Sequence, residues 1–117
     1  MPAPSDAKRH LRIGGSLPDA VTRSHLADGR VVGWYGPPGA VIDAELADQR
    51  VPPALAARYG ASPEEFWPRW TRTECAAKLA DVPITLWLAE HGLDPGPLDV
   101  VTTVIDEVVV SVAFPGT

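Results

Sequence analysis

The 117-residue sequence predicts an α+β fold in which helices pack on an antiparallel sheet. Three observations support this class. Strand-like runs joined by tight turns lie in both the first and the last third of the chain, and helical segments lie between them. The composition, with 45% apolar and 21% charged residues, is typical of a folded domain. At this length we expect a loosely ordered N-terminal segment, residues 1–19, followed by one domain, residues 20–117.

The first part of the chain alternates short strand-like runs with turn signals. Asp28-Gly29 is a strong hairpin signal, and it separates two of these runs. His25 therefore lies at the end of a strand beside a tight turn, with Arg23 close by. A histidine in this place is either a solvent-facing residue or a hydrogen-bond donor to an anion. We expect strands to begin at residue 11 and to cover residues 20–25 and 30–35.

The next run, residues 41–45, predicts a short buried strand after a rigid Gly-Pro-Pro-Gly break. Asp43 and Glu45 alternate along it, so both side chains leave the same face. Two carboxylates at this spacing repel each other unless solvent or a cation lies between them. A site of oxygen ligands suits magnesium, and the alternative is a pair of exposed acids at a strand end.

Two helices are expected next. A short one runs to about Tyr59 and ends on Gly60. A longer one begins at Pro63, where Ser62 and Glu65 have the spacing of a capping box. It is expected to end near residue 79 or 80, because Pro83 disfavours helical geometry in the residue before it.

The longer helix carries a polar pair on an aromatic face. Trp70, Glu74 and Lys78 are spaced four residues apart, and Phe66 lies on the same face. Two interpretations are open. In the first, Glu74 and Lys78 form an ordinary helix-surface ion pair. In the second, Glu74 is a metal ligand or general base, and Lys78 binds an anion.

The last third of the chain predicts a short helix and a hairpin. The helix covers residues 84–91 and closes on Gly92. Two β-rich runs, residues 98–105 and 108–114, are separated by Asp106-Glu107, which reads as a tight turn. We therefore expect an antiparallel hairpin under a helix.

Charge and cysteine content restrict the classes of function. The net charge is −5, and no Lys or Arg follows Lys78. This asymmetry permits an anionic ligand near the basic N-terminal half and argues against duplex nucleic acid. The single Cys75 excludes an internal disulfide framework and fits a reducing compartment. No apolar run is long enough to cross a membrane, so we expect no membrane partner and a cytoplasmic location.

Three motifs, taken together and in order, resemble those of the 4′-phosphopantetheinyl transferase superfamily. They are Ser24-His25 at a strand end, Val41-Ile42-Asp43-Ala44-Glu45 on a strand, and Trp70-Thr71-Arg72-Thr73-Glu74-Cys75-Ala76-Ala77-Lys78 on a helix. The closing run Val109-Val110-Ser111-Val112-Ala113 is also similar to the last strand of the family. The resemblance covers roughly residues 20–114 and follows the motif order of the two-lobed type, shortened to about one lobe.

The resemblance implies a magnesium-dependent reaction. Coenzyme A supplies 4′-phosphopantetheine, and a serine of an acyl or peptidyl carrier protein attacks its β-phosphate. Asp43, Glu45 and Glu74 are implied as the magnesium ligands, and Glu74 as the base that takes the serine proton. Lys78 is implied as a contact of the diphosphate. His25 is implied as a contact of the 3′-phosphate of coenzyme A, with Arg23 as a weaker candidate.

The sequence also departs from the family pattern at three positions. Val41 stands at a usual glycine, Thr73 at a usual lysine, and Asp81 near an expected glycine. Because the chain is about one lobe long, the resemblance implies a homo-oligomer or a complex with a polyketide or peptide synthase. Tyr59 and Trp67 are candidates for docking the carrier protein. The alternatives are a transferase-like interaction module with little catalysis, and an unrelated small α+β protein whose three acids lie far apart.

Overall fold

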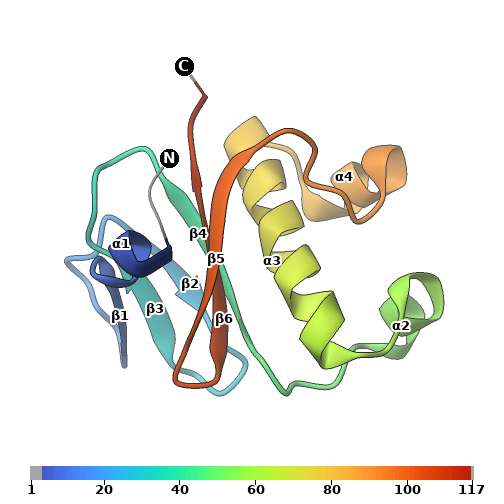
Figure 1. Ribbon diagram of the computed structural model, residues 1–117, viewed down its shortest axis with the longest axis horizontal. Helices are drawn as coiled ribbons and strands as arrows, with labels where there is room; N and C mark the ends of the chain where they lie inside the picture. The colour runs from blue at the N-terminus through green and yellow to red at the C-terminus, as the bar shows by residue number, and fades with distance from the viewer. Residues whose placement is uncertain (1–3, 117) are drawn as a thin grey trace.

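Six strands of the computed structural model divide into two three-stranded antiparallel sheets; the three helices α2, α3 and α4 lie on one side, and the short α1 lies beside the first sheet (Figure 1). The structure describes residues 4–116. The first sheet has the order β1-β3-β2, and the second has the order β4-β6-β5. The α+β class is as expected, but the strands form two sheets rather than one. The strands are β1 (Leu11–Gly14), β2 (Thr22–His25), β3 (Val31–Trp34), β4 (Val41–Leu46), β5 (Asp99–Ile105) and β6 (Val108–Phe114).

The second sheet lies in the middle of the molecule because both of its faces are covered. On one face of β4, Ile42 and Ala44 pack with Trp34 of the first sheet in one apolar core. The opposite face of β4 and β6 packs against the long helix α3 (Figure 1). The helices are α1 (Pro4–Lys8), α2 (Pro53–Tyr59), α3 (Pro63–Ala80) and α4 (Ile84–His91).

The N-terminal segment is more ordered than the sequence indicates. Residues 4–8 form α1, which contacts β5, and residues 11–14 form β1. Ala7 and Leu11 are buried in the core between the sheets, and this burial fixes the segment. Residues 4–14 therefore belong to the folded domain instead of a loose tail, and residues 1–3 lie outside the described part.

The start of α3 differs from the predicted capping box. Pro63 takes an early helical position as expected, but the Ser62 side chain makes no capping hydrogen bond. The backbone carbonyl of Ser62 instead accepts from the N–H groups of Glu65 and Phe66. Proline fixes its own φ and has no N–H to satisfy, so the first turn closes through backbone bonds alone.

Tight turns end the regular elements near the predicted places. Asp106 and Glu107, both with positive φ (48° and 64°), form the two-residue turn between β5 and β6, as hairpin geometry requires. Asp81 ends α3 in a left-handed conformation with φ 56° and ψ 45°. Asp tolerates this region better than most residues.

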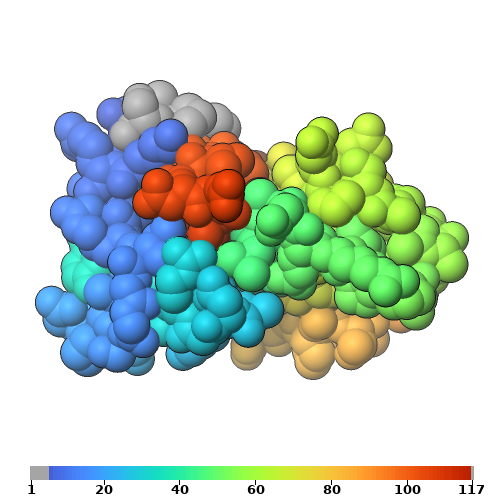
Figure 2. Space-filling view, turned by 90° about the horizontal axis from the view of Figure 1, so that it is seen from below, coloured from blue at the N-terminus to red at the C-terminus, as the bar shows by residue number. Residues whose placement is uncertain are grey.

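The first sheet and the helices α2, α3 and α4 lie at opposite ends of the molecule (Figure 1). Figure 2 shows the first sheet, coloured blue to cyan, separated from the green and yellow segments that contain α2 and the start of α3. The site described below lies between these ends, at the contact of β4 with α3. Within residues 4–116, no helix combines the length and the apolar content that crossing a membrane requires.

Candidate functional site: an acidic cluster between β4 and α3

Three acids gather where β4 packs on α3. Asp43 and Glu45 leave the same face of β4, and Glu74 comes from the middle of α3. The charges of Glu74 and Glu45 both raise the pKa of Asp43, and the charge of Glu74 raises that of Glu45. Such mutual effects require neighbouring carboxylates. We call Asp43, Glu45 and Glu74 the acidic cluster.

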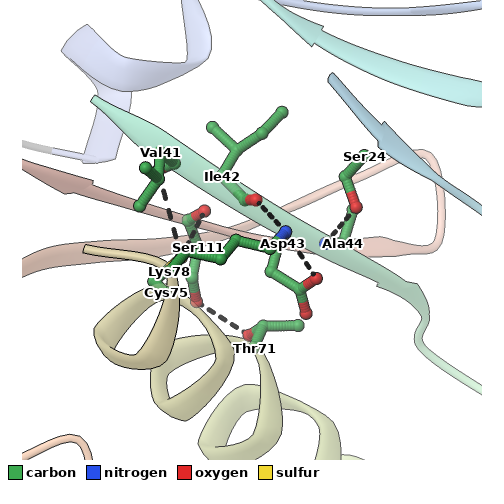
Figure 3. A network of polar contacts seen from close by, with 9 residues as sticks. All are labelled: Ser24, Val41, Ile42, Asp43, Ala44, Thr71, Cys75, Lys78 and Ser111. Atoms are coloured by element: carbon green, nitrogen blue, oxygen red, sulfur yellow. Dashed lines mark hydrogen bonds and ion pairs between the residues drawn. The ribbon is translucent and has the colours of Figure 1, made fainter. Parts of the chain in front are cut away.

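Asp43 is the most buried member, with 7% of its surface exposed. Its Oδ1 lies 3.3 Å from Nζ of Lys78, and the same ammonium donates to the carbonyl of Ile42 at 2.8 Å (Figure 3). Its Oδ2 is buried without a hydrogen-bond partner among the described residues. Burial, opposed by Lys78, raises the pKa of Asp43 to about 8. The carboxyl therefore sits in a place that strongly favours an added proton or cation.

Glu45 is half-buried, next to the side chains of Trp70 and Gln49. Burial is the main cause that raises its pKa to about 7, and the charge of Glu74 adds to it. The polar side-chain groups of Trp70 and Gln49 act in the opposite direction. Trp70 in turn stacks on Phe66, with ring centroids 5.7 Å apart. The aromatic face predicted for α3 thus lies directly beside the acidic cluster.

Glu74 is the member that remains partly open to solvent. Burial raises its pKa above the ordinary value, and the charge of Lys78 partly offsets this. A glutamate with a raised pKa that still contacts solvent has the properties of a general base. Of the residues predicted for the site, the structure therefore brings together Asp43, Glu45, Glu74 and Lys78.

A chain of hydroxyl groups lies next to the acidic cluster, between α3 and the second sheet. Thr71 and Ser111 are fully buried, and their hydroxyl oxygens lie 2.7 Å apart (Figure 3). The Ser111 hydroxyl is also 2.8 Å from that of Thr102. Cys75 donates through Sγ to the carbonyl of Ser111, at 3.4 Å, and burial raises its pKa. Its thiol is thus kept neutral, which removes it as a nucleophile.

His25 and Arg23 lie on a different face. Along β2 the exposed Arg23 and His25 alternate with the buried Ser24, so they point away from the side that Ser24 faces. Ser24 itself accepts a hydrogen bond from the N–H of Ala44 at 3.1 Å and so ties β2 to β4 (Figure 3). Arg23 donates to the carbonyl of Leu17 at 3.3 Å. Ser24, not His25, thus makes the contact between this motif and the strand of the acidic cluster.

Trp67 and Thr73 of α3 are both buried. Trp67 is 2% exposed and donates through its indole to the carbonyl of Gln49 at 2.7 Å. It therefore belongs to the core and cannot form a docking surface with Tyr59. Thr73, which stands at the lysine of the family pattern, is also fully buried and bonds to the carbonyl of Arg69. A lysine with the same backbone would need to leave this buried place.

The fit of the cluster to a divalent cation can be judged from its donors. Carboxylate oxygens are the ligands that magnesium prefers, and the unpartnered Oδ2 of Asp43 is free to bind. Within residues 4–116, however, no group of three or more His, Cys, Asp or Glu side chains is arranged to hold a metal ion. The chemistry of the donors therefore fits magnesium, while the present side-chain arrangement leaves the ammonium of Lys78 next to Asp43.

Several residues of the site escape detection from the sequence alone. Gln49 lies in none of the quoted motifs, and Ser111 is quoted only as part of the closing run, without a role; its contact depends on Thr71, 40 positions away in the chain. For Ser111, a polar residue within a run of valines was the available signal. Comparison of the chain with family models, with curated proteins and with solved structures found no match.

Proposed function

We propose that the protein is a magnesium-dependent 4′-phosphopantetheinyl transferase that acts on a serine of an acyl or peptidyl carrier protein. The observation that carries the proposal is the meeting of Asp43, Glu74 and Lys78 between β4 and α3, since Lys78 lies 3.3 Å from Asp43 and its charge acts on Glu74. The order of the three motifs along the chain supports the same function.

In this reaction the serine hydroxyl attacks the β-phosphorus of coenzyme A. The new bond joins the serine oxygen to phosphorus, the bond from that phosphorus to the bridging oxygen breaks, and 3′,5′-adenosine bisphosphate leaves. Glu74, whose pKa is raised by burial, accepts the serine proton. Lys78 contacts the diphosphate, where a cation stabilises the negative charge of the leaving group.

Asp43, Glu45 and Glu74 are the residues that would hold magnesium. When bound, the ion would neutralise charge on the diphosphate. Burial is the main cause that raises the pKa of Asp43 and of Glu45, and the negative charge of Glu74 adds to it in both. His25 and Arg23 are proposed to bind the 3′-phosphate of coenzyme A. Because they lie on the other face of β2, they reach it from outside the acidic cluster.

The experiment is an incubation of the protein with coenzyme A, magnesium and several apo carrier proteins. Mass spectrometry of the carrier should show the added phosphopantetheinyl group with the wild type. Glu74→Gln should abolish the gain, because the amide cannot accept the proton. Glu65→Gln, an exposed acid in the first turn of the same helix, should leave the gain unchanged. No gain with any carrier, or an equal gain with Glu74→Gln, would contradict the proposal.

A second candidate is an interaction module of a polyketide or peptide synthase that keeps the transferase fold with little catalysis. The bonds of Lys78 to Asp43 and to the carbonyl of Ile42 favour it, because they use the ammonium in the structure of the site. This candidate predicts that the protein binds a carrier protein without modifying it. Under either candidate we propose that a second copy or a synthase completes the nucleotide site of this single lobe.

A further inference from the structure

The two edge strands of the second sheet differ in how their outward backbone groups are used. In an antiparallel ladder, every second residue turns its N–H and C=O groups away from the neighbouring strand. On β4, the carbonyl of Ile42 accepts from Nζ of Lys78 at 2.8 Å, and the N–H of Ala44 donates to the Ser24 hydroxyl at 3.1 Å (Figure 3). Side chains of α3 and β2 therefore occupy the edge of β4.

The other edge strand, β5, turns unused backbone groups outward. Because the turn after β5 has two residues with positive φ, Ile105 and Val108 at its base form a hydrogen-bonded pair. Alternate residues along β5 then face away from β6: Val100, Thr102 and Val104. Within residues 4–116, the N–H and C=O groups of these three residues have no hydrogen-bond partner. The edge of β5 is therefore a template to which a further strand can add.

The sequence of β5 leaves this edge unprotected. Edge strands that stay single usually carry a charged residue, a proline or a bulge. Residues 100–105 contain no charged residue and no proline, and they pair one to one with β6 without a bulge. β5 runs between α1 and α3 (Figure 1), and Val104 is 53% exposed. Apolar side-chain surface thus lies beside the free backbone groups.

β5 is complementary to a second copy of itself. When two such strands run antiparallel with Thr102 opposite Thr102, Val100 of each copy lies opposite Val104 of the other. All three outward residues then form hydrogen-bonded pairs, and each pair exchanges two N–H···O bonds. The acids at the two ends of the strand, Asp99 and Asp106, lie opposite apolar residues of the second copy in this register. No two carboxylates are therefore directly opposite each other, an arrangement that would destabilise the pairing.

We propose that the protein forms a symmetric dimer through the edges of β5, which join the second sheets of two copies into one continuous antiparallel sheet. The copies are related by a twofold axis at Thr102, so each copy offers the same residues to the other. The two β4 strands, and with them the acidic clusters, lie at the outer edges of the joined sheet. The dimer therefore neither rests on the proposed function nor completes the nucleotide site.

Amide hydrogen exchange distinguishes this contact from any other. When the full chain is followed by NMR, the N–H groups of Val100, Thr102 and Val104 should exchange more slowly at high protein concentration than at low. The N–H groups of Val101 and Thr103 should be protected at both concentrations, because they bond to β6. Sedimentation of the concentrated sample should show a dimer. A monomer at every concentration, or a dimer whose three outward amides exchange as in the monomer, would overturn the proposal.

Val104→Pro removes a bond that holds the dimer and none within the described chain. The N–H of Val104 faces outward, so proline at this edge position keeps the ladder with β6. By symmetry the dimer loses two hydrogen bonds, and its dissociation constant should rise about tenfold or more. Equal dissociation constants for Val104→Pro and the wild type would contradict the pairing of the edges.

A charge at the edge gives a second variant with a matched control. Val104→Lys places an ammonium opposite Val100 of the second copy and should weaken the dimer. Val21→Lys changes the same residue type at a similar exposure, 51%, outside the second sheet, and should leave the dissociation constant unchanged. If exchange of the Thr103 amide shows that Val104→Pro has lost the hairpin, Val104→Lys decides by the same criterion. A wild type that transfers nothing to a carrier protein removes the proposed function, while these measurements still decide the dimer.

Discussion

The two faces of the sheet β4-β6-β5 are both buried, but one is mainly apolar whereas the other also buries a carboxyl group. Toward the first sheet, β4 and β6 present Ile42, Ala44, Val110 and Val112, each no more than 1% exposed. The alternate residues of the same strands face α3. Among them, Asp43 of β4 and its paired residue Ser111 of β6 are buried. The alternation of a strand thus separates a mainly apolar interface from a mixed one, in which Asp43 and Ser111 lie near the apolar cluster of Val109, Phe66 and Trp67.

The difference indicates which interface stabilises the fold. A fully buried aliphatic or aromatic side chain contributes about 1.5–3 kcal/mol through the hydrophobic effect. A buried polar group without a partner costs about 1–3 kcal/mol, and Asp43 Oδ2 is such a group. The face toward the first sheet therefore stabilises the domain throughout, whereas the face toward α3 combines apolar packing, as of Val109 with Phe66 and Trp67, with a buried charged group that is kept at a cost, as is typical of functional sites.

The largest effect is expected from truncating the apolar interface. Trp34 is 1% exposed, and its ring meets those of His10 and Phe114 at 5.2 and 6.0 Å. Trp34→Ala should lower the free energy of unfolding by about 4 kcal/mol, as measured by urea denaturation. Trp87→Ala on α4, where the ring is only half-buried, should cost clearly less. Equal losses from the two changes would remove the distinction between core and periphery.

A pH dependence is expected from the polar interface. The pKa of Asp43 is about 8 in the folded protein against an ordinary value of 3.8, so the folded state binds more protons between these values. Stability should be greatest below about pH 4 with respect to this group, and should fall as pH rises toward 8. Over pH 5–8 the loss should be on the order of 4 kcal/mol, and urea denaturation at each pH measures it.

Asp43→Asn tests this assignment. The amide does not ionise, so the fall in stability between pH 5 and 8 should become shallower, leaving the share of Glu45, whose pKa is raised to about 7. Glu65→Gln, at an exposed acid, should keep the wild-type profile. A profile for Asp43→Asn as steep as that of the wild type would show that another group titrates.

The smallest effect is expected from the buried hydroxyl pair. Thr71→Val keeps the shape of the side chain but removes the 2.7 Å contact with Ser111, which retains Thr102 as a partner. The free energy of unfolding should fall by about 1 kcal/mol. Thr73→Val is the matched control, because its equally buried hydroxyl bonds to the carbonyl of Arg69 within its own helix. If Thr73→Val costs more than Thr71→Val, the contact between α3 and β6 contributes less than proposed.

The bounds of helices and turns could be predicted where nearby residues in the sequence, such as prolines and turn residues, set them. Pro63 and Pro83 bracket α3, and the observed bounds 63–80 agree with the expected end at 79 or 80. The turns at Asp28-Gly29 and Asp106-Glu107 also fall where the residues predict them. The helix α1 was missed, because its order comes from burial of Ala7 against distant strands and not from its own sequence.

For the site, the sequence by itself determined which acids share a face of β4 and which residues line one side of α3, because the periods of strand and helix are local properties. Only the tertiary structure decided that Lys78 pairs with Asp43 across 35 positions, that Trp70 and Gln49 meet Glu45, and that His25 points away from β4. These relations depend on how α3 and β2 dock against the second sheet. Docking is set by the whole apolar core, which no short window of sequence contains.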